Sequence, residues 1–179
     1  MFAPLPELAT LHDPSDGGHV LQNVTLVPSP QPSNFTMLRA LDPTTALHHH
    51  MQITADFSTA IDASLVVCVE CDENGGGGVT ATMQITVVDN KPSFTCMLGN
   101  GASKALGISD AALAKGSVAA VLDVFTDGAV VELFANNGEQ VGEQGRPSVS
   151  NAGVGFAAGG KAAEVNFSVE LWRMRPSVE

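Results

Sequence analysis

The stretch VLDVFTDGAVVELFANNG, residues 121–138, decides the fold of this chain. Two apolar runs, residues 121–125 and 130–135, flank the dipeptide Asp127-Gly128. An Asp-Gly pair between two segments of β-branched and aromatic residues is a strong hairpin signal, because glycine adopts the positive φ that a primed turn requires. The stretch therefore predicts a β-hairpin.

The second run of this hairpin carries an acid among apolar residues. Successive side chains of a strand point to opposite faces, so Val130, Glu132 and Phe134 share one face. Neither face is polar throughout, which favours a hairpin covered on both sides. A covered Glu132 would need a partner, because burying an unpaired carboxylate is costly. We expect it to tie a turn or an arginine rather than a ligand, the candidates being Arg146, Arg173 and Arg175.

The same hairpin carries a family resemblance. VFTDGAVVELFANNG is similar to the segment VFVDxSxVEVFxNxG of the C-terminal β-sandwich domain in glycoside hydrolase family 32, which includes invertases, levanases, inulinases and fructosyltransferases. Gly128 and Ala129 stand where Arg-Ser is usual. The positions that agree with the pattern are Asp127, Glu132, Phe134, Asn136 and Gly138.

Two further segments extend the resemblance over nearly the whole chain. PELATL, residues 6–11, resembles the PVxELxxLR linker that leaves the family's catalytic propeller, with His12 in place of the usual arginine. AAEVNFSVELW, residues 162–172, resembles the closing strand SAxxxSLxVWxL.

Composition and patterning agree with an all-β fold. The 179 residues are 44% hydrophobic and include 18 glycines and 10 prolines, which suits one core with many turns. We expect a two-sheet antiparallel β-sandwich, of jelly-roll or concanavalin-like type, over residues 19–179. Residues 1–18 read as a linker or docking arm.

About ten strands are expected at the short spacing of a sandwich. Residues 109–116 form either one helical turn, with Ser109 as N-cap, or a loop. Residues 138–150 read as a polar connection. The expected strands are residues 20–27, 35–41, 47–57, 64–71, 79–88, 93–98, 121–125, 130–135, 153–158 and 164–174.

The net charge of −11 argues against nucleic acid and anionic membrane surfaces as partners. No apolar run approaches the roughly 20 residues that span a bilayer, and the first four residues lack the features of a signal peptide. We expect a soluble chain. Its compartment is left open, and the resemblance implies an extracellular or vacuolar location.

Three cysteines, Cys68, Cys71 and Cys96, are too few for a disulfide framework. Residues three apart in a strand point to opposite faces, so Cys68 and Cys71 are poorly placed to hold one metal. We expect buried structural thiols. A Cys68–Cys96 disulfide is the alternative in an oxidising compartment.

The triplet His48, His49 and His50 is the other candidate metal motif. In an extended segment only His48 and His50 share a side, and zinc sites recruit three or four converging ligands. The triplet is therefore interpreted as a surface feature, with Met51, Ile53, Ala55 and Phe57 facing inward beside it and His50, Gln52, Thr54 and Asp56 facing outward.

The resemblance places catalysis outside this chain. The family's activity belongs to a five-bladed propeller with WMNDPN, RDP and EC motifs, which Leu41-Asp42-Pro43 and Glu70-Cys71 match only in fragments and by chance. A retaining glycosidase needs two carboxyl groups about 5 Å apart, and nothing here pairs a second acid with Glu70. We expect no enzyme activity, catalytic residue or cofactor.

Three functions follow from the resemblance. The first is a non-catalytic module that docks onto a catalytic propeller, leaving an apolar patch or covering it in a homodimer. The second is a module that binds the terminal fructose of a fructan. The third is a structural subunit adopted by another protein assembly. For fructan binding, the candidate residues are Asp127, Glu132, Asn136, Asn137 and Arg146.

Overall fold

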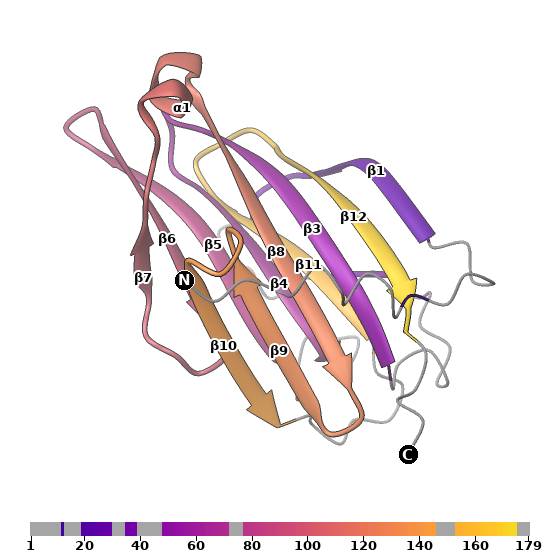
Figure 1. The fold of residues 1–179 in the computed structure, drawn as a ribbon. Coiled ribbons are helices and arrows are strands. Elements are labelled where there is room, and N and C mark those ends of the chain that lie inside the picture. The colour runs from indigo at the N-terminus through magenta and orange to yellow at the C-terminus, as the bar shows by residue number, and fades with distance from the viewer. Residues whose placement is uncertain are drawn as a thin grey trace.

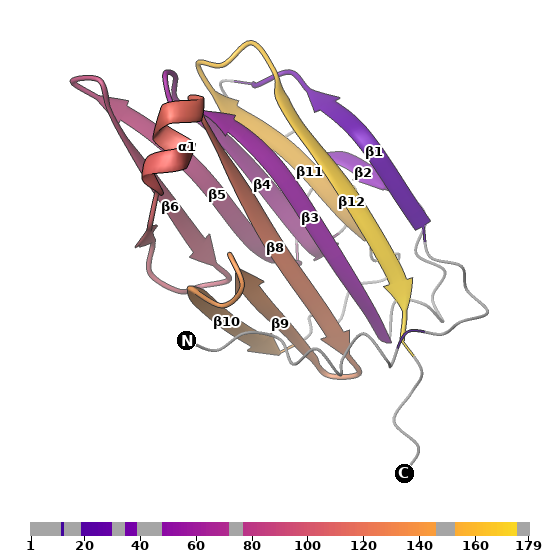
Figure 2. The same ribbon diagram turned by 45° about the horizontal axis from the view of Figure 1, so that its top comes forward.

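The computed structural model describes residue 12 and residues 19–29, 35–38, 48–71, 77–145 and 153–174. These residues form two stacked antiparallel sheets of six strands each, with one short helix at an end of the sandwich (Figures 1 and 2). The predicted fold class is confirmed. Residues 1–11 and 13–18, and with them most of the expected linker, lie outside the described residues.

The first sheet has the order β1-β12-β3-β8-β9-β10 and the second has the order β2-β11-β4-β5-β6-β7. In the first sheet the strands are β1 (His19–Leu26), β12 (Val165–Arg173), β3 (His48–Ser58), β8 (Ser117–Asp127), β9 (Val130–Ala135) and β10 (Gln140–Gly145). In the second sheet they are β2 (Thr36–Leu38), β11 (Gly153–Gly160), β4 (Ala63–Cys71), β5 (Val79–Val88), β6 (Lys91–Leu98) and β7 (Lys104–Leu106).

The core fills the space between the two sheets with alternate residues of their strands. On β3 the inward residues are the predicted Met51, Ile53, Ala55 and Phe57, all at most 1% exposed. The facing sheet supplies Leu65, Val67 and Val69 from β4, together with residues of β5, β6 and β11. A period of two thus gives each strand one apolar face, and burial of these faces drives the sheets together.

The predicted hairpin joins β8 to β9 through Gly128 and Ala129, with Asp127 paired to Val130. Gly128 has φ 55°, and Ala129 is not among the residues with positive φ. A glycine at the first of two central positions is typical of a type II′ turn, whose twist matches that of paired strands.

The expectation that both faces of β9 are covered is wrong. Val131, Leu133 and Ala135 are buried, whereas Glu132 is exposed on the outer face, so it needs no buried arginine partner. Its cross-strand neighbours are Phe125 on β8 and Glu143 on β10. Strand β9 lies next to the edge strand of its sheet, where the outer face is open to solvent.

Two strands were missed by the sequence analysis, β7 and β10. The sequence of β10, QVGEQG, has one β-branched residue and two glycines, so residues 138–150 read as a connection. Pairing of all six of its residues with β9 makes it an edge strand. Strand propensity depends mainly on neighbours, which a single sequence does not display.

Of the two alternatives for residues 109–116, a helical turn or a loop, the structure shows the helix α1 (Asp110–Lys115). Ser109 has extended backbone and its side chain accepts a hydrogen bond from the Ala112 amide, as an N-cap does. Gly116 ends the helix in the left-handed conformation, with φ 76°. Among the described residues no helix is long and apolar enough to cross a membrane.

All three cysteines are buried as thiols, as expected. The alternative Cys68–Cys96 disulfide is not formed, because Cys96 belongs to the core between the sheets while Cys68 alternates with the core residues Val67 and Val69. Burial raises the pKa of the Cys96 thiol to about 12, which keeps it protonated and unreactive.

The register of the hairpin can be tested with two neighbouring substitutions. We expect Leu133→Ala to lower the free energy of unfolding by about 2–5 kcal/mol, because it empties a fully buried site. Glu132→Ala should change it by no more than about 0.5 kcal/mol, since the side chain is exposed and faces the like-charged Glu143. Urea unfolding measures both values. Equal losses would show that the register is different.

Candidate functional site

A row of rings crosses the outer face of the first sheet. Trp172 on β12 is paired with His50 on β3, which is paired with Phe125 on β8. The His50 ring is stacked on Phe125 at a centroid distance of 4.1 Å and on Trp172 at 5.0 Å. Phe134 on β9 adds an edge-on contact to Phe125 at 5.9 Å. Four neighbouring strands therefore build one continuous ring cluster.

His12, from the segment before the first strand, completes this cluster. Its ring is stacked on Trp172 at 4.7 Å with an interplanar angle of 6°, and on His50 at 5.2 Å. Its backbone forms an isolated antiparallel bridge with Met174. Each such ring pair stabilises by about 0.5–1.5 kcal/mol beyond the area it buries. His12 is thus fixed at the end of β12.

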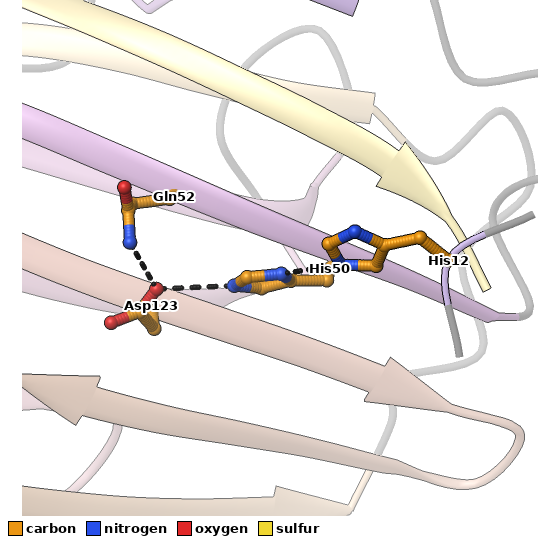
Figure 3. A network of polar contacts seen from close by, with 4 residues as sticks. All are labelled: His12, His50, Gln52 and Asp123. Carbon is orange, nitrogen blue, oxygen red and sulfur yellow. Dashed lines mark hydrogen bonds and ion pairs between the residues drawn. The ribbon is translucent and has the colours of Figure 1, made fainter. Parts of the chain in front are cut away.

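A chain of hydrogen bonds connects His12, His50, Asp123 and Gln52 (Figure 3). Gln52 Nε2 donates to Asp123 Oδ1 at 2.8 Å, and His50 Nε2 lies 3.1 Å from the same oxygen. On its other side, His50 Nδ1 lies 3.0 Å from His12 Nε2. The Asp123 side chain is only 7% exposed and that of His50 11%. The name histidine cluster is used below for six residues: His12, His50, Gln52, Asp123, Phe125 and Trp172.

The network specifies one arrangement of protons. An ionised Asp123 only accepts, so His50 donates from Nε2 and its Nδ1 is left as an acceptor. His12 then donates from Nε2. Protonating both imidazoles would place N–H against N–H, which removes this bond. Partial burial, and secondly the charge of His50, lower the pKa of His12 from its ordinary 6.5.

This arrangement is suited to anchoring. Both ring nitrogens of His50 are engaged within the cluster, one by Asp123 and the other by His12. Within the described ranges no group of three or more histidines, cysteines and acids could hold a metal ion. The cluster can hold a backbone segment in place and respond to protons.

Asp127 and Asn136, two of the residues predicted to bind sugar, lie at opposite ends of β9. Asp127 Oδ1 is bound to His48 Nδ1 at 2.7 Å, and Asn136 Oδ1 accepts from the Val121 amide at 3.0 Å. Six residues of extended strand separate these ends by roughly 20 Å. Asn137 has φ 56° in the turn beside Asn136.

Glu132 lies midway along β9, so the structure does not bring Asp127, Glu132 and the asparagine turn together in one pocket. The fifth predicted residue, Arg146, lies outside the described residues.

The interpretation of the three histidines as a surface triplet is wrong for two of them. His49 is fully buried beside Thr126, with 3.2 Å between the ring and the hydroxyl, and His50 is 8% exposed. The sequence did show His50 on an outward-facing position of its strand. It could not show that this strand lies next to the strand of Trp172, and nothing in its pattern singled out Asp123.

No protein-family model matches the chain, and no curated protein matches it. Solved structures do match. Fructan 1-exohydrolase IIa from Cichorium intybus aligns with 97% of this chain at a TM-score of 0.70 and 11% identity, using 37% of its own length. The chain has the fold of one part of that enzyme. The fold that the family 32 resemblance implied is therefore confirmed.

Two other solved structures also match most of this chain with only part of their own length. Exo-inulinase from Aspergillus awamori aligns with 98% of this chain at a TM-score of 0.53 and 10% identity, over 33% of its own chain. The protein named GH43B of a xyloglucan locus from Bacteroides ovatus aligns with 85% at a TM-score of 0.55 and 11% identity, again over 33%. The chain thus spans about a third of the length of these proteins. Because enzymes named for different polysaccharides share it, the fold does not by itself choose a substrate.

Acid should weaken the His12 contact. The lowered pKa of His12 means that the folded structure, in which this ring contacts Trp172 and His50, favours the neutral imidazole. The contact is therefore strongest above pH 6.5 and weakens as the pH falls below that value. Trp172 is the sole tryptophan, so its fluorescence reports on the contact. We expect its emission to change between about pH 7.5 and pH 5.

The matched variants are His12→Ala and His48→Ala. His12→Ala should shift the Trp172 emission at neutral pH toward that of a solvated indole. It should also abolish the change in emission between neutral and acidic pH, called the pH step below. His48→Ala removes a histidine of β3 that binds Asp127 at the neighbouring position of the outer face, and should preserve the step. A step that persists in His12→Ala would contradict the assignment to His12.

Proposed function

We propose that this chain is the non-catalytic β-sandwich module of a system related to family 32 glycosidases, and that it supports a catalytic propeller. The observation that carries the proposal is the extent of the match. Nearly the whole chain, 97%, corresponds to only 37% of the fructan exohydrolase. In that enzyme the sandwich is accompanied by a further region of the same chain, about twice as long. The proposal assigns this chain the same supporting relation to a catalytic partner.

The histidine cluster supports this role. His12 directly follows residues 6–11, which resemble the linker that leaves the propeller. By stacking on Trp172 and bonding to His50, it fixes the end of that linker against the sheet. A linker clamped at the sandwich gives the joint a defined geometry, whereas a free linker leaves two domains moving independently.

The position of Glu70 agrees with the absence of a catalytic role. It is the extra residue of a β-bulge in β4, where Gly153 pairs with Cys71 and Val154 with Val69. Its φ is 60°, and it is only 1% exposed. A carboxyl group enclosed in this way has no surface to offer a glycosidic bond. The Leu41-Asp42-Pro43 fragment lies outside the described residues.

Fructan binding stays a prediction that the structure supports less well than the supporting role. The residues predicted for it are Asp127, Glu132, Asn136, Asn137 and Arg146. Asp127 and Asn136 already form hydrogen bonds within the sandwich, and their separation along β9 favours no single pocket. The adopted subunit is the remaining alternative, and it requires a partner other than a propeller.

The test is reconstitution with the family 32 propeller encoded in the same genome, in the same gene or separately. We expect a 1:1 complex by light scattering and a higher melting temperature of the propeller. At a sandwich concentration 100 times the Kd, binding should stabilise the propeller by about 2.7 kcal/mol. The chain alone should not hydrolyse sucrose, inulin or levan.

Two results would contradict the proposal. Hydrolysis by the purified chain would make it an enzyme in its own right. A mixture that scatters as two separate species, with an unchanged melting temperature, would leave the adopted subunit as the better account.

A further inference from the structure

A polar cavity lies at the edge of the sandwich, away from the histidine cluster. Its volume is about 660 Å³, and it lies between β10 and the loop of residues 99–103 that joins β6 to β7. These strands belong to different sheets and lie at the same side of the molecule (Figure 1). Gly142 permits the close approach, because a Cβ there would lie 2.7 Å from Leu98 Cβ.

The lining of the cavity combines neutral polar side chains with two apolar ones. Leu98 and Val141 supply the apolar part, and one hydroxyl and three amide side chains supply donors and acceptors. The polar groups are those of Asn100, Ser103, Gln140 and Gln144. Amides can both donate to and accept from a hydroxyl group, so this surface complements a ligand rich in hydroxyls. Its volume falls in the range of small-molecule sites, about 300–1,000 Å³.

The walls of the cavity are held in place by hydrogen bonds across it. Lys104 Nζ donates to the Glu139 carbonyl oxygen, and Gln140 Nε2 donates to the Ala102 carbonyl oxygen at 3.2 Å. Within the loop, the Gly101 amide donates to the Leu98 carbonyl oxygen at 3.0 Å. The loop is thereby tied to the start of β10, which reduces the entropy that a ligand must remove on binding.

Gln140 gives independent evidence of an incomplete site. The residue is 9% exposed, and its Oε1 is buried without a hydrogen-bond partner in the described part of the chain. The amide cannot simply be reversed, because Nε2 is needed as donor to Ala102. A buried acceptor left without a donor costs about 1–3 kcal/mol. A hydroxyl donor that reaches this oxygen would recover this energy.

Charge at the cavity favours a neutral ligand. Within the lining, the positive charge of Lys104 and the negative charge of Glu143 offset each other. The net charge of the chain is strongly negative. A phosphorylated or carboxylated ligand is therefore disfavoured relative to a neutral one.

We infer that this cavity binds a neutral saccharide through Gln140, Asn100, Ser103 and Gln144. The site goes beyond the supporting role proposed above and does not depend on it, because every residue that carries it lies within the sandwich. It is also distinct from the five residues that the sequence suggested for fructan binding.

The experiment titrates the purified 179-residue chain with fructose, sucrose and a short inulin oligosaccharide, and with fructose 6-phosphate as the charged counterpart. Calorimetry gives the Kd, and amide chemical shifts from NMR locate the site. We expect a Kd of about 1 mM or tighter for at least one neutral saccharide, with weaker binding of the phosphate ester. The shifted amides should lie in residues 98–104 and 140–145.

Variants separate the site from a general effect. Gln144→Ala and Asn100→Ala should each weaken binding about tenfold, since each removes hydrogen bonds to the ligand. Gln140→Leu should abolish it, and a urea unfolding curve checks that this variant is folded. Gln84→Ala, which removes an exposed amide from β5, is the matched control and should bind normally.

Three results would overturn the inference: no heat and no shifts with any neutral saccharide at about 10 mM, shifts that lie outside the two segments, or tighter binding of the phosphate ester. None of these results bears on complex formation with a propeller, so this inference and the supporting role fail independently.

Discussion

The register of three neighbouring strands, β12, β3 and β8, is the constraint on which the rest of the structure depends. It aligns Leu171, Met51 and Val124 on the inner face, where they enter the core. One residue along, the same register aligns Trp172 with His50 and His50 with Phe125 on the outer face. A slip of one residue would exchange the two faces, burying the polar set and exposing the apolar one. Burial of the core thus also fixes the geometry of the ring cluster outside it.

The cluster couples a tertiary contact to a proton equilibrium. His12 is held by two ring contacts and one hydrogen bond, and this bond requires that the two imidazoles are not both protonated. Asp123 is bonded both to His50 and to Gln52. The orientation of the His50 ring therefore depends on residues of β3 and β8. The contact of His12 is therefore strong when its imidazole is neutral and weak when acid protonates it. In the proposed module it would make the junction with the linker sensitive to pH.

The centre and one edge of the first sheet serve different purposes. The histidine cluster lies on the central strands β12, β3 and β8 and receives His12, while the edge strand β10 approaches the second sheet and lines the polar cavity. The supporting role depends on the first region and the saccharide inference on the second. The matched enzymes share the fold of this sandwich over about a third of their chains, and the fold leaves its surface sites free to differ.

The sequence alone determined the fold class, the alternation of β3 and the β8–β9 hairpin, and it marked Ser109 as the N-cap of a helix that only the structure distinguished from a loop. Each of these depends on local rules: side chains alternate along a strand, glycine takes positive φ in a turn, and serine caps a helix. Only the tertiary structure decided that β10 is a strand, that Glu132 is exposed and that His12, His50 and Trp172 meet. These facts depend on which strands are neighbours, and pairing partners far apart in the chain leave no periodic signal in one sequence. The same reason explains why Asp127 and Asn136, close in sequence, lie at opposite ends of one extended strand.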